Sequence, residues 1–478
     1  MAAEHKVLSF IPYLQSPPTQ GGTGRTSSPG SKSAKDDSST TNAATTDDTS
    51  RTLSTTAESD GNDPYGPRRW HSNLIKLSGK DRAINEFSVE RVGESTEHTF
   101  VMLHGYGAGL GFFYKNFEPL SRRPHWQLYA LDLMGMGRSS RPPFRIHSKD
   151  KEGKIREAEN WFVDSLEEWR KEKKIERFTL LGHSLGGYMA VCYALKYPGR
   201  LEKLILASPV GIPEDPYAVQ QPLPDGDDSA TSASAGTDDT DGNNFLNARA
   251  KASNVASNEP PKRPYSKWFT WLWDQNVSVF SFVRWSGPLG PRLVSGWTSR
   301  RFGQLPQEEA SALHDYSYSL FRQRGSGEYA LSYVLAPGAY ARLPLIRRIG
   351  QIGRGEYRPA DVGPRTAELE AGVEKVRENG VPVVFMYGSH DWMDVKGGRA
   401  GVEKLKEAKE KAEKEATATG VATKPDQSDA KVLIVDKAGH HLYLDGYAEF
   451  NEMMLEEMRD TERRQKALNT VLKGGKAA

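Results

Sequence analysis

The chain has 478 residues, of which 37% are hydrophobic, and its formal net charge is +2. This balance excludes the classes of protein that bind nucleic acid or acidic substrates through a strongly basic overall charge. The one cysteine, Cys192, excludes an intramolecular disulfide framework, and no uninterrupted apolar run approaches the ~20 residues that a bilayer-spanning helix needs. We therefore expect a large core, soluble or peripheral to a membrane, in which Cys192 is a buried structural thiol.

Residues 1–64 are expected to form a disordered extension. From residue 15 onward they are dominated by Ser, Thr, Gly, Pro and Asp, which cannot bury enough apolar surface to offset the entropy of folding. No acidic residue occurs between His5 and Lys35, as in a mitochondrial presequence, but Glu4 and the scarcity of arginine argue against one.

Residues 65–213 carry strands and glycine-rich turns in the order of an α/β core. Strands are predicted at 84–91, 98–103, 126–131, 178–182 and 201–208, with an amphipathic helix at 157–172. The strand at 98–103 ends in HGYGAG, where backbone N–H groups are left without partners. The N–H of Tyr106 is therefore one candidate donor of an oxyanion hole, although the same loop without a ligand is an ordinary tight turn.

The strand that begins at Phe178 runs into GHSLG and then directly into a helix. A strand that reverses into a helix within one residue holds that residue in a strained turn, which exposes its side chain and makes Ser184 the candidate nucleophile. Gly182 and Gly186 fit the flanking positions, because a Cβ there would meet backbone. The N–H of Leu185 is the second candidate oxyanion donor. A glycine-rich turn with a capping serine is the alternative interpretation.

The composition changes twice after the first half of the core. Residues 214–262 are rich in Asp, Gly, Ser, Ala and Asn and are expected to form a disordered insertion, whereas residues 263–375 are expected to form a helical cap above the active site. Aromatic side chains interleaved with basic ones suit the headgroup region of a membrane, but they could equally pack the cap against the core. Five of the ten tryptophans lie in this cap: Trp268, Trp271, Trp273, Trp285 and Trp297.

Residues 376–478 complete the core with strands at 381–387 and 431–435 and a closing helix around 447–471. The first strand leads into GSHDWMD, where an acid at the end of a late strand is placed to orient a histidine, so Asp391 and Asp394 are both candidates. The second strand leads into KAGHH, which offers His440 and His441 as the base. The intervening insertion, 402–428, has Lys and Glu at i,i+4 spacing and is expected to be a solvated helical face.

These motifs stand in the chain order of the α/β-hydrolase superfamily. In addition, the stretches EAENWFVDSLEEWRKEKKIERFTLLGHSLGGY, ASPVGIP, SGEYALSYVLAPGAYARLPLIRRI and AGHHLYLD resemble the subgroup that holds abhydrolase-domain proteins 4 and 5 and the fungal cardiolipin-specific deacylases. The resemblance covers roughly residues 65–213 and 263–465. It implies an α/β fold, with a mostly parallel sheet, helices on both faces and an inserted helical cap, and no metal or cofactor.

The resemblance also implies a serine hydrolase that deacylates a cardiolipin-like phospholipid. Ser184 would attack the ester, His440 would transfer the proton, and Asp391 would hold the imidazole tautomer. The superfamily's usual G-x-x-D spacing favours Asp391 over Asp394, and the preceding glycine favours His440 over His441. The implied location is peripheral to the mitochondrial inner membrane, with the cytoplasm, lipid droplets or endoplasmic reticulum as alternatives.

Two other functions are compatible with the sequence. His440 and Asp445 form an H-x-x-x-x-D pattern that has been interpreted in such relatives as an acyltransferase signature, so the alternative is acylation of lysophosphatidic acid by acyl-CoA. A non-catalytic lipid-binding regulator is a further alternative, against which the retained Ser184, His440 and Asp391 argue. The sequence indicates a phospholipid partner at a membrane surface and no nucleic acid, and it leaves the oligomeric state open.

Overall fold

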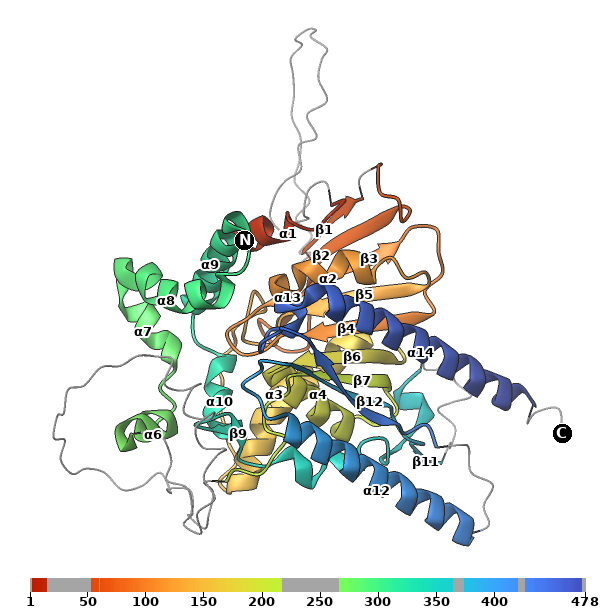
Figure 1. The fold of residues 1–478 in the computed structure, drawn as a ribbon. Coiled ribbons are helices and arrows are strands. Elements are labelled where there is room, and N and C mark those ends of the chain that lie inside the picture. The colour runs from red at the N-terminus through yellow and green to blue at the C-terminus, as the bar shows by residue number, and fades with distance from the viewer. Residues whose placement is uncertain are drawn as a thin grey trace, which may run out of the picture.

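A nine-stranded sheet forms the centre of the computed structural model, which describes residues 2–14, 53–59, 61–216, 266–363, 374–419 and 426–474. The strand order is β1-β2-β3-β5-β4-β6-β7-β12-β13 (Figure 1). The strands are β1 (Leu53–Glu58), β2 (Arg68–Lys76), β3 (Ala83–Arg91), β4 (His98–Leu103), β5 (Trp126–Leu131), β6 (Phe178–His183), β7 (Leu201–Ala207), β12 (Val383–Gly388) and β13 (Ala430–Val435).

The strands from β5 to β13 in this order pair in parallel, and β1, β2 and β3 add an antiparallel edge. Two small two-stranded sheets lie outside it, formed by β8 (Leu335–Ala336) with β9 (Tyr340–Ala341) and by β10 (Glu356–Tyr357) with β11 (Val376–Arg377). The predicted fold class, a mostly parallel sheet with helices on both faces, is confirmed.

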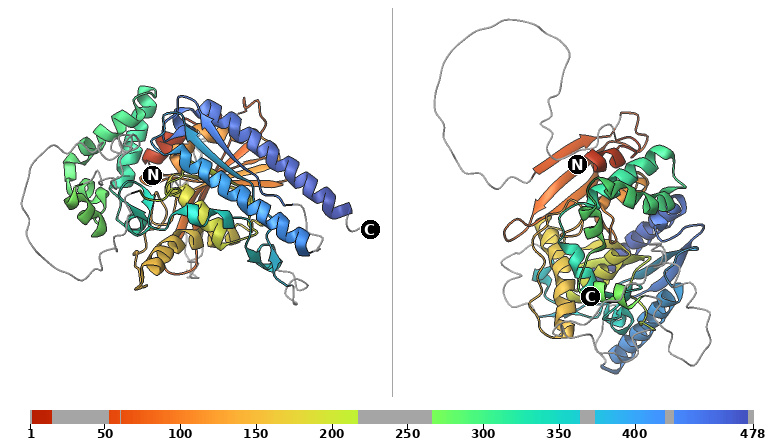
Figure 2. Two further views of the ribbon diagram at one scale, coloured as in Figure 1. Left: turned by 60° about the horizontal axis from the view of Figure 1, so that its bottom comes forward. Right: turned by 90° about the vertical axis from the view of Figure 1, so that its left-hand side faces the viewer.

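Helices surround this sheet and form the cap. They are α1 (Ala2–Leu8), α2 (Tyr114–Leu120), α3 (Lys151–Glu172), α4 (Leu185–Lys196), α6 (Lys267–Asp274), α7 (Val279–Trp285), α8 (Gly290–Phe302), α9 (Gln307–Phe321), α10 (Leu331–Val334), α12 (Val395–Thr419), α13 (Leu442–Asp445) and α14 (Tyr447–Gly474). The cap helices α6 to α9 stand beside the sheet and not on either face of it (Figures 1 and 2).

Two apolar clusters form the core, one on each face of the sheet. Successive residues of a strand point to opposite faces, so Phe100 and Met102 of β4 belong to one cluster, and Val101 and Leu103 to the other. Helices α3, α4 and α12 cover the face of Val101, whereas α2 and α14 cover the face of Phe100. Because both faces are buried, the central strands are nearly continuous apolar runs, which is why the sequence reveals them.

The expected disorder of residues 1–64 is wrong at both ends of that segment. Val7 and Leu8 of α1 are buried in the core, and β1 pairs along its length with β2. Tertiary contacts stabilise these segments, because a helix as short as α1 is marginal in isolation. Residues 15–52 lie outside the described residues, as does nearly all of the insertion expected at 214–262.

Helix α1 joins the cap to the core. Glu4 pairs with Arg138 at 2.6 Å, and Lys6 pairs with Asp315 of α9 at 3.4 Å. Figure 2 shows α1 beside the cap helices in both views. The amino-terminal helix therefore contacts both the core and the cap.

The charged helix expected at 402–428 begins earlier, at Val395, and is not wholly solvated. Val402 and Leu405 are buried against the core, while most of the lysines and glutamates of α12 are exposed. Residues 420–425 lie outside the described part of the chain.

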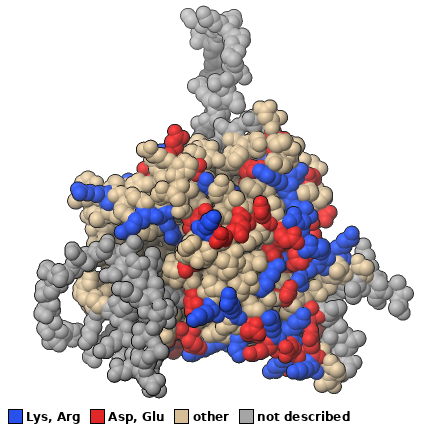
Figure 3. All heavy atoms as spheres, in the orientation of Figure 1, with Lys and Arg blue, Asp and Glu red and all other residues tan. Residues whose placement is uncertain are grey.

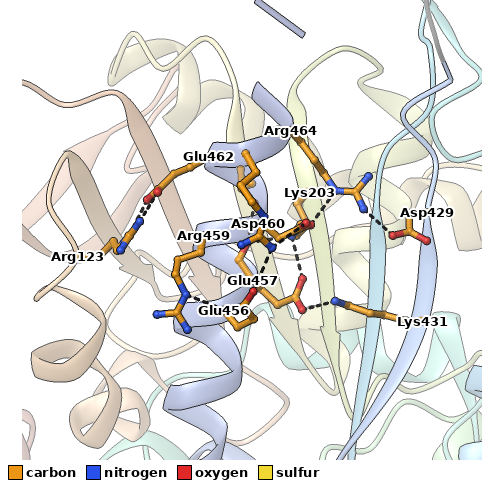
Figure 4. Close-up of polar contacts among 12 residues, drawn as sticks. Arg123, Lys203, Asp429, Lys431, Glu456, Glu457, Arg459, Asp460, Glu462 and Arg464 are labelled. Atoms are coloured by element: carbon orange, nitrogen blue, oxygen red, sulfur yellow. Dashed lines mark hydrogen bonds and ion pairs between the residues drawn. The ribbon is translucent and has the colours of Figure 1, made fainter. Parts of the chain in front are cut away.

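A buried lysine fixes α14 to the sheet. Lys203 of β7 is 1% exposed, and its Nζ lies 2.8 Å from Glu457 Oε2 and 2.7 Å from Asp460 Oδ2. Lys431 of β13 adds a second cation, 2.6 Å from Glu457. Figure 4 shows these side chains converging between α14 and two strands. A buried charge needs such partners, because an unpaired one is strongly destabilising.

Candidate active site

Ser184 occupies the turn between β6 and α4. Its φ of 54° and ψ of −115° place a non-glycine residue in the sparsely populated positive-φ region. A Cβ at Gly182 would collide with the carbonyl of Gly186, and a Cβ at Gly186 would lie 2.6 Å from the carbonyl oxygen of His104. The strand and helix can therefore approach this closely only with glycine at both positions, as the sequence motif predicts.

The structure brings Ser184, His440 and Asp391 into one hydrogen-bonded row. Ser184 Oγ lies 3.0 Å from His440 Nε2, and His440 Nδ1 lies 3.2 Å from Asp391 Oδ1. The serine follows β6, the acid follows β12 and the histidine follows β13. All three thus lie at the carboxyl ends of parallel strands, where functional residues of open α/β sheets gather.

Of the two candidate acids, only Asp391 contacts the histidine. Its side chain is fully buried, and its Oδ1 also accepts a hydrogen bond from the N–H of Met393 at 3.0 Å. Asp394 is exposed, and its Oδ1 accepts a hydrogen bond from the N–H of Lys396 at 2.9 Å, at the start of α12. The orienting acid is therefore Asp391 in this geometry, while Asp394 stabilises the following turn.

Burial sets the protonation states of the row. Burial lowers the pKa of His440 below its usual 6.5, although the neighbouring Asp391 opposes this change. Burial alone would raise the pKa of Asp391, but the charge of His440 and hydrogen bonds from His440, Ser208 and Met393 hold that pKa below its usual value. At neutral pH the histidine is therefore a neutral base beside an ionised carboxylate, as proton transfer from a serine requires.

Ser208 is a polar contact of this row to which the sequence analysis assigned no role. It follows β7, is fully buried and has a φ of 47°. Its hydroxyl donates a hydrogen bond to Asp391 Oδ2, and its Oγ lies 2.6 Å from His440 Nδ1. The one available signal in the sequence was a serine at the end of a buried strand next to the nucleophile strand.

The loop after β4 lies directly against the nucleophile. A Cβ at Gly105 would lie 2.9 Å from Ser184 Cβ. Leu185 is the first residue of α4, so its N–H has no acceptor within the helix. Within the described ranges, neither this N–H nor that of Tyr106 donates a hydrogen bond to another residue. Both remain candidate donors to an oxyanion, and that role stays a prediction.

Asp445 does not contact His440. Its Oδ2 accepts a hydrogen bond from the N–H of Gly439 at 3.1 Å, and its Oδ1 accepts one from Gln304 Nε2 at 2.6 Å. Burial raises the pKa of Asp445 above its usual value. It thus ties the loop that carries His440 to the cap residue Gln304.

The remaining candidate residues have structural positions. His441 contacts Arg301 of α8, and its ring packs against Phe112 at a centroid distance of 5.7 Å, whereas the ring that bonds Ser184 is that of His440. Cys192 is buried on α4, and burial raises the pKa of its thiol well above the usual value. Among the residues that the structure describes, no cluster of three or more His, Cys, Asp or Glu side chains is arranged to hold a metal ion.

Comparison with known proteins places this geometry in a family. Residues 98–230 match the family described as alpha/beta hydrolase fold. A 1-acylglycerol-3-phosphate O-acyltransferase of Arabidopsis thaliana is 31% identical over 404 residues, which cover 83% of this chain and 74% of the relative. The 1-acylglycerol-3-phosphate O-acyltransferase ABHD5 of Rattus norvegicus is 28% identical over 371 residues, 76% of this chain and 77% of the relative.

A third relative carries a different name. The (lyso)-N-acylphosphatidylethanolamine lipase of Bos taurus is 29% identical over 369 residues, which cover 76% of this chain and 79% of the relative. The similarity to all three relatives thus extends over about three quarters or more of this chain. Sequence and geometry agree that this chain belongs to the α/β-hydrolase superfamily.

Proposed function

We propose that this protein acylates lysophosphatidic acid through an acyl-Ser184 intermediate, with release of free fatty acid as a side reaction. The observation that carries the proposal is the 3.0 Å approach of Ser184 Oγ to a histidine that a buried carboxylate orients. Two of the relatives named above are 1-acylglycerol-3-phosphate O-acyltransferases. They favour this alternative over deacylation of a cardiolipin-like phospholipid, which the sequence analysis preferred.

The geometry supports a two-step transfer. In the first step Ser184 Oγ attacks the thioester carbonyl of acyl-CoA, His440 takes the hydroxyl proton, and the departing CoA sulfur then receives that proton. In the second step the acceptor hydroxyl gives its proton to His440 and attacks the acyl carbon. Ser184 Oγ leaves and regains a proton from His440. The N–H groups of Tyr106 and Leu185 would stabilise the oxyanion of both steps.

Hydrolysis is the second candidate function, because water can replace the lysolipid in the second step. The lipase name of the Bos taurus relative supports it. Ser184 is only 8% exposed, which limits the access of water to the acyl-enzyme and favours transfer to a bound acceptor. The intact row of three side chains argues against the third possibility, a non-catalytic lipid-binding regulator.

Asp445 would serve the acyltransferase indirectly. It holds the loop of His440 to the cap through Gly439 and Gln304. Asp445→Asn should therefore lower hydrolysis and transfer together. Selective loss of transfer would instead make Asp445 part of the acceptor site.

The substrates of such an enzyme are lipids, and the cap offers a surface for them. Trp268, Trp271 and Trp285 are exposed, whereas Trp273 donates a hydrogen bond to the carbonyl of Leu335 at 2.9 Å and Trp297 packs against other rings. Packing thus accounts for Trp273 and Trp297, while membrane contact stays a prediction for the three exposed rings. We propose that the exposed rings contact the membrane interface.

One stretch of the cap has a charge that agrees with an anionic membrane surface. Residues 275–307 contain four arginines and no acidic residue. Figure 3 shows basic residues among uncharged ones over the cap, while acidic and basic residues are mixed around α12 and α14. No helix in the described ranges is long and apolar enough to span a bilayer. Cardiolipin as a substrate and a mitochondrial location stay predictions.

The proposal is tested by incubating the purified protein with isotope-labelled oleoyl-CoA and lysophosphatidic acid in phosphatidylcholine vesicles. Mass spectrometry then measures labelled phosphatidic acid, labelled fatty acid and free CoA. Wild type should form phosphatidic acid, and Ser184→Ala should lose both lipid products, whereas Ser299→Ala, an exposed serine on α8, should retain them.

Three outcomes would contradict the proposal. Fatty acid without phosphatidic acid would promote hydrolysis to the main function. Phosphatidic acid from Ser184→Ala would remove the acyl-serine route. Inactivity of the wild type toward oleoyl-CoA and toward phospholipid esters would favour the lipid-binding regulator.

A further inference from the structure

Three stacked rings close the cap over the oxyanion loop. The ring of Tyr106 is nearly parallel to that of Phe280 on α7, with a centroid distance of 4.9 Å and an interplanar angle of 14°. Phe280 stacks in turn on Phe321 of α9, at 4.5 Å and 15°. A Cβ at Gly107 would lie 3.3 Å from the tip of the Phe280 ring. Phe280 therefore fills the space directly above the loop that carries a candidate oxyanion donor.

Two small cavities flank this stack, and each has a volume of about 20 Å³. Tyr106 and Glu328 line both of them. The first is also lined by Trp273 and Leu331, and the second by Phe280 among other apolar side chains. Ligand sites have volumes of roughly 300–1,000 Å³, so neither cavity can hold an acyl chain while Phe280 is in place. The space beside the oxyanion loop is thus occupied by a side chain of the cap.

The opposite face of α7 is apolar and unprotected. Val279, Phe282 and Trp285 are 42%, 48% and 73% exposed, and they lie three residues apart, on one side of the helix. Monomeric soluble proteins rarely expose contiguous apolar patches of large size, and such patches commonly mark interaction sites. Arg292 and Arg300 of the following helix α8 are exposed, while Arg284 pairs with Glu328 and Arg301 contacts His441. This combination fits the headgroup and upper acyl region of an anionic bilayer.

One ion pair holds α7 in its closed position. Arg284, near the end of the helix, pairs with the buried Glu328 at 2.8 Å. Glu328 also lines both small cavities, so the pair lies where the helix would have to separate from the core. Phe280 and Arg284 thus supply the ring stack and the ion pair that hold α7 at the site, and Arg284 also donates a hydrogen bond to the carbonyl of Gln323 at 3.2 Å. A short helix can exchange such contacts for contacts with lipid.

We propose that α7 is a lipid-responsive plug of the acyl-chain site. At a bilayer, Val279, Phe282 and Trp285 enter the lipid, α7 moves away from Tyr106, and the acyl chain of the donor takes the place of Phe280 between Tyr106 and Phe321. Away from a bilayer, Phe280 fills the site and Ser184 is closed to long-chain substrates. This inference rests on the proposed acyl chemistry of Ser184, and it adds where the chain binds and what admits it.

The experiment measures access to Ser184 without requiring turnover. Fluorophosphonates with a short or a sixteen-carbon alkyl chain react covalently with an activated serine, and the labelling rate is followed with and without vesicles of phosphatidylcholine and phosphatidylglycerol. For the wild type, vesicles should raise the rate of the long-chain probe at least tenfold and that of the short-chain probe less than threefold.

Two matched variants of α7 test its two faces separately: the inner face, which carries Phe280, and the outer face, which carries Phe282 and Trp285. Phe280→Ala should label with the long-chain probe at least tenfold faster than wild type in the absence of vesicles, with little further acceleration by them. Phe282→Ala combined with Trp285→Ala should keep the slow lipid-free rate and lose the acceleration. Phe280→Leu provides a second test of the inner face if the alanine variant does not fold, and Glu328→Gln, which weakens the ion pair, should also raise the lipid-free rate.

The labelling rates distinguish failure of the proposed function from failure of the plug. If neither probe labels the wild type, or both label Ser184→Ala equally well, the proposed function fails. If the short-chain probe labels Ser184 but removal of the Phe280 ring leaves the lipid-free rate of the long-chain probe unchanged, the plug is wrong and the proposed function stands. The plug is also wrong if vesicles raise the labelling rate of the variant with Phe282→Ala and Trp285→Ala as much as that of the wild type.

Discussion

Replacement of Asp391 by Asn should reduce catalysis by three to four orders of magnitude. In the transition state His440 becomes an imidazolium, whose Nδ1 lies 3.2 Å from the fully buried carboxylate. At this distance and an effective dielectric constant of about 20, two unit charges attract by about 5 kcal/mol. At 1.36 kcal/mol for each factor of ten in rate, the neutral amide should lower kcat by roughly 10³ to 10⁴.

Asp394→Asn is the matched control, because it makes the same change three residues away. The described contact of the Asp394 carboxylate is the hydrogen bond from the N–H of Lys396, and Asn is as good an acceptor at a helix start as Asp. Its kcat should therefore stay within about twofold of wild type. The assay is acyl-enzyme formation in a single turnover with oleoyl-CoA, followed by CoA release. A loss below tenfold in Asp391→Asn, or a larger loss in Asp394→Asn, would refute the assignment of the acid.

Four further predictions follow from other contacts. Ser208→Ala removes a hydrogen bond to the ionised Asp391. Because a hydrogen bond to a charged group contributes about 1.5–3 kcal/mol, the rate of acyl-enzyme formation should fall by roughly 10- to 150-fold, while the circular dichroism spectrum should stay that of the wild type. Because burial lowers the pKa of His440, and its neutral form is the base, kcat/KM should rise with pH through a midpoint below 6.5 and be level above it; a midpoint above 7 would contradict the burial argument. Cys192 should resist a thiol reagent in the native protein and react fully in denaturant, since its buried thiol keeps a raised pKa; fast native labelling would show that the helix is not packed as described. Lys203→Met should lower the free energy of unfolding by about 3 kcal/mol in urea titrations, because the buried Glu457 loses one of its two cations and Asp460 loses a second partner, and a change below 1 kcal/mol would show that Lys431 and Arg464 neutralise both carboxylates without Lys203.

The central strands and the nucleophile turn could be predicted because their signals are local. The strands around Val101, Leu180 and Ile205 are apolar on both faces, and the glycines beside Ser184 are demanded by backbone contacts within the same turn. Strand β2 gave no such signal. Its residues Arg68 and Ser72 are buried, and Arg68 is neutralised by Asp63 and by the distant Glu118, so the alternation of buried and exposed positions along β2 does not appear as alternating apolar and polar residues.

The rest of the site depends on contacts between distant segments. Asp391 and Asp394 differ in role because the loop after β12 turns one toward His440 and the other toward solvent, a choice that three residues of spacing do not determine. Ser208 reaches the row only because Ala207 of β7 pairs with His183 and with Met386 on either side of it. No local pattern encodes that register.

The packing of α1 has a practical consequence for shortened forms of the protein. Deleting everything before β1 would remove Val7 and Leu8 from the core and leave Arg138 without Glu4. The segment 15–52 would instead have to be excised internally, with α1 retained. Leu14 pairs with Ser59, so its nearest neighbour is the far end of β1. A linker that replaces this segment must run from Leu14, beside Ser59, back along β1 to Leu53. This distance is about 20 Å at roughly 3.3 Å per residue, and a flexible glycine and serine linker of about 13 residues would span it.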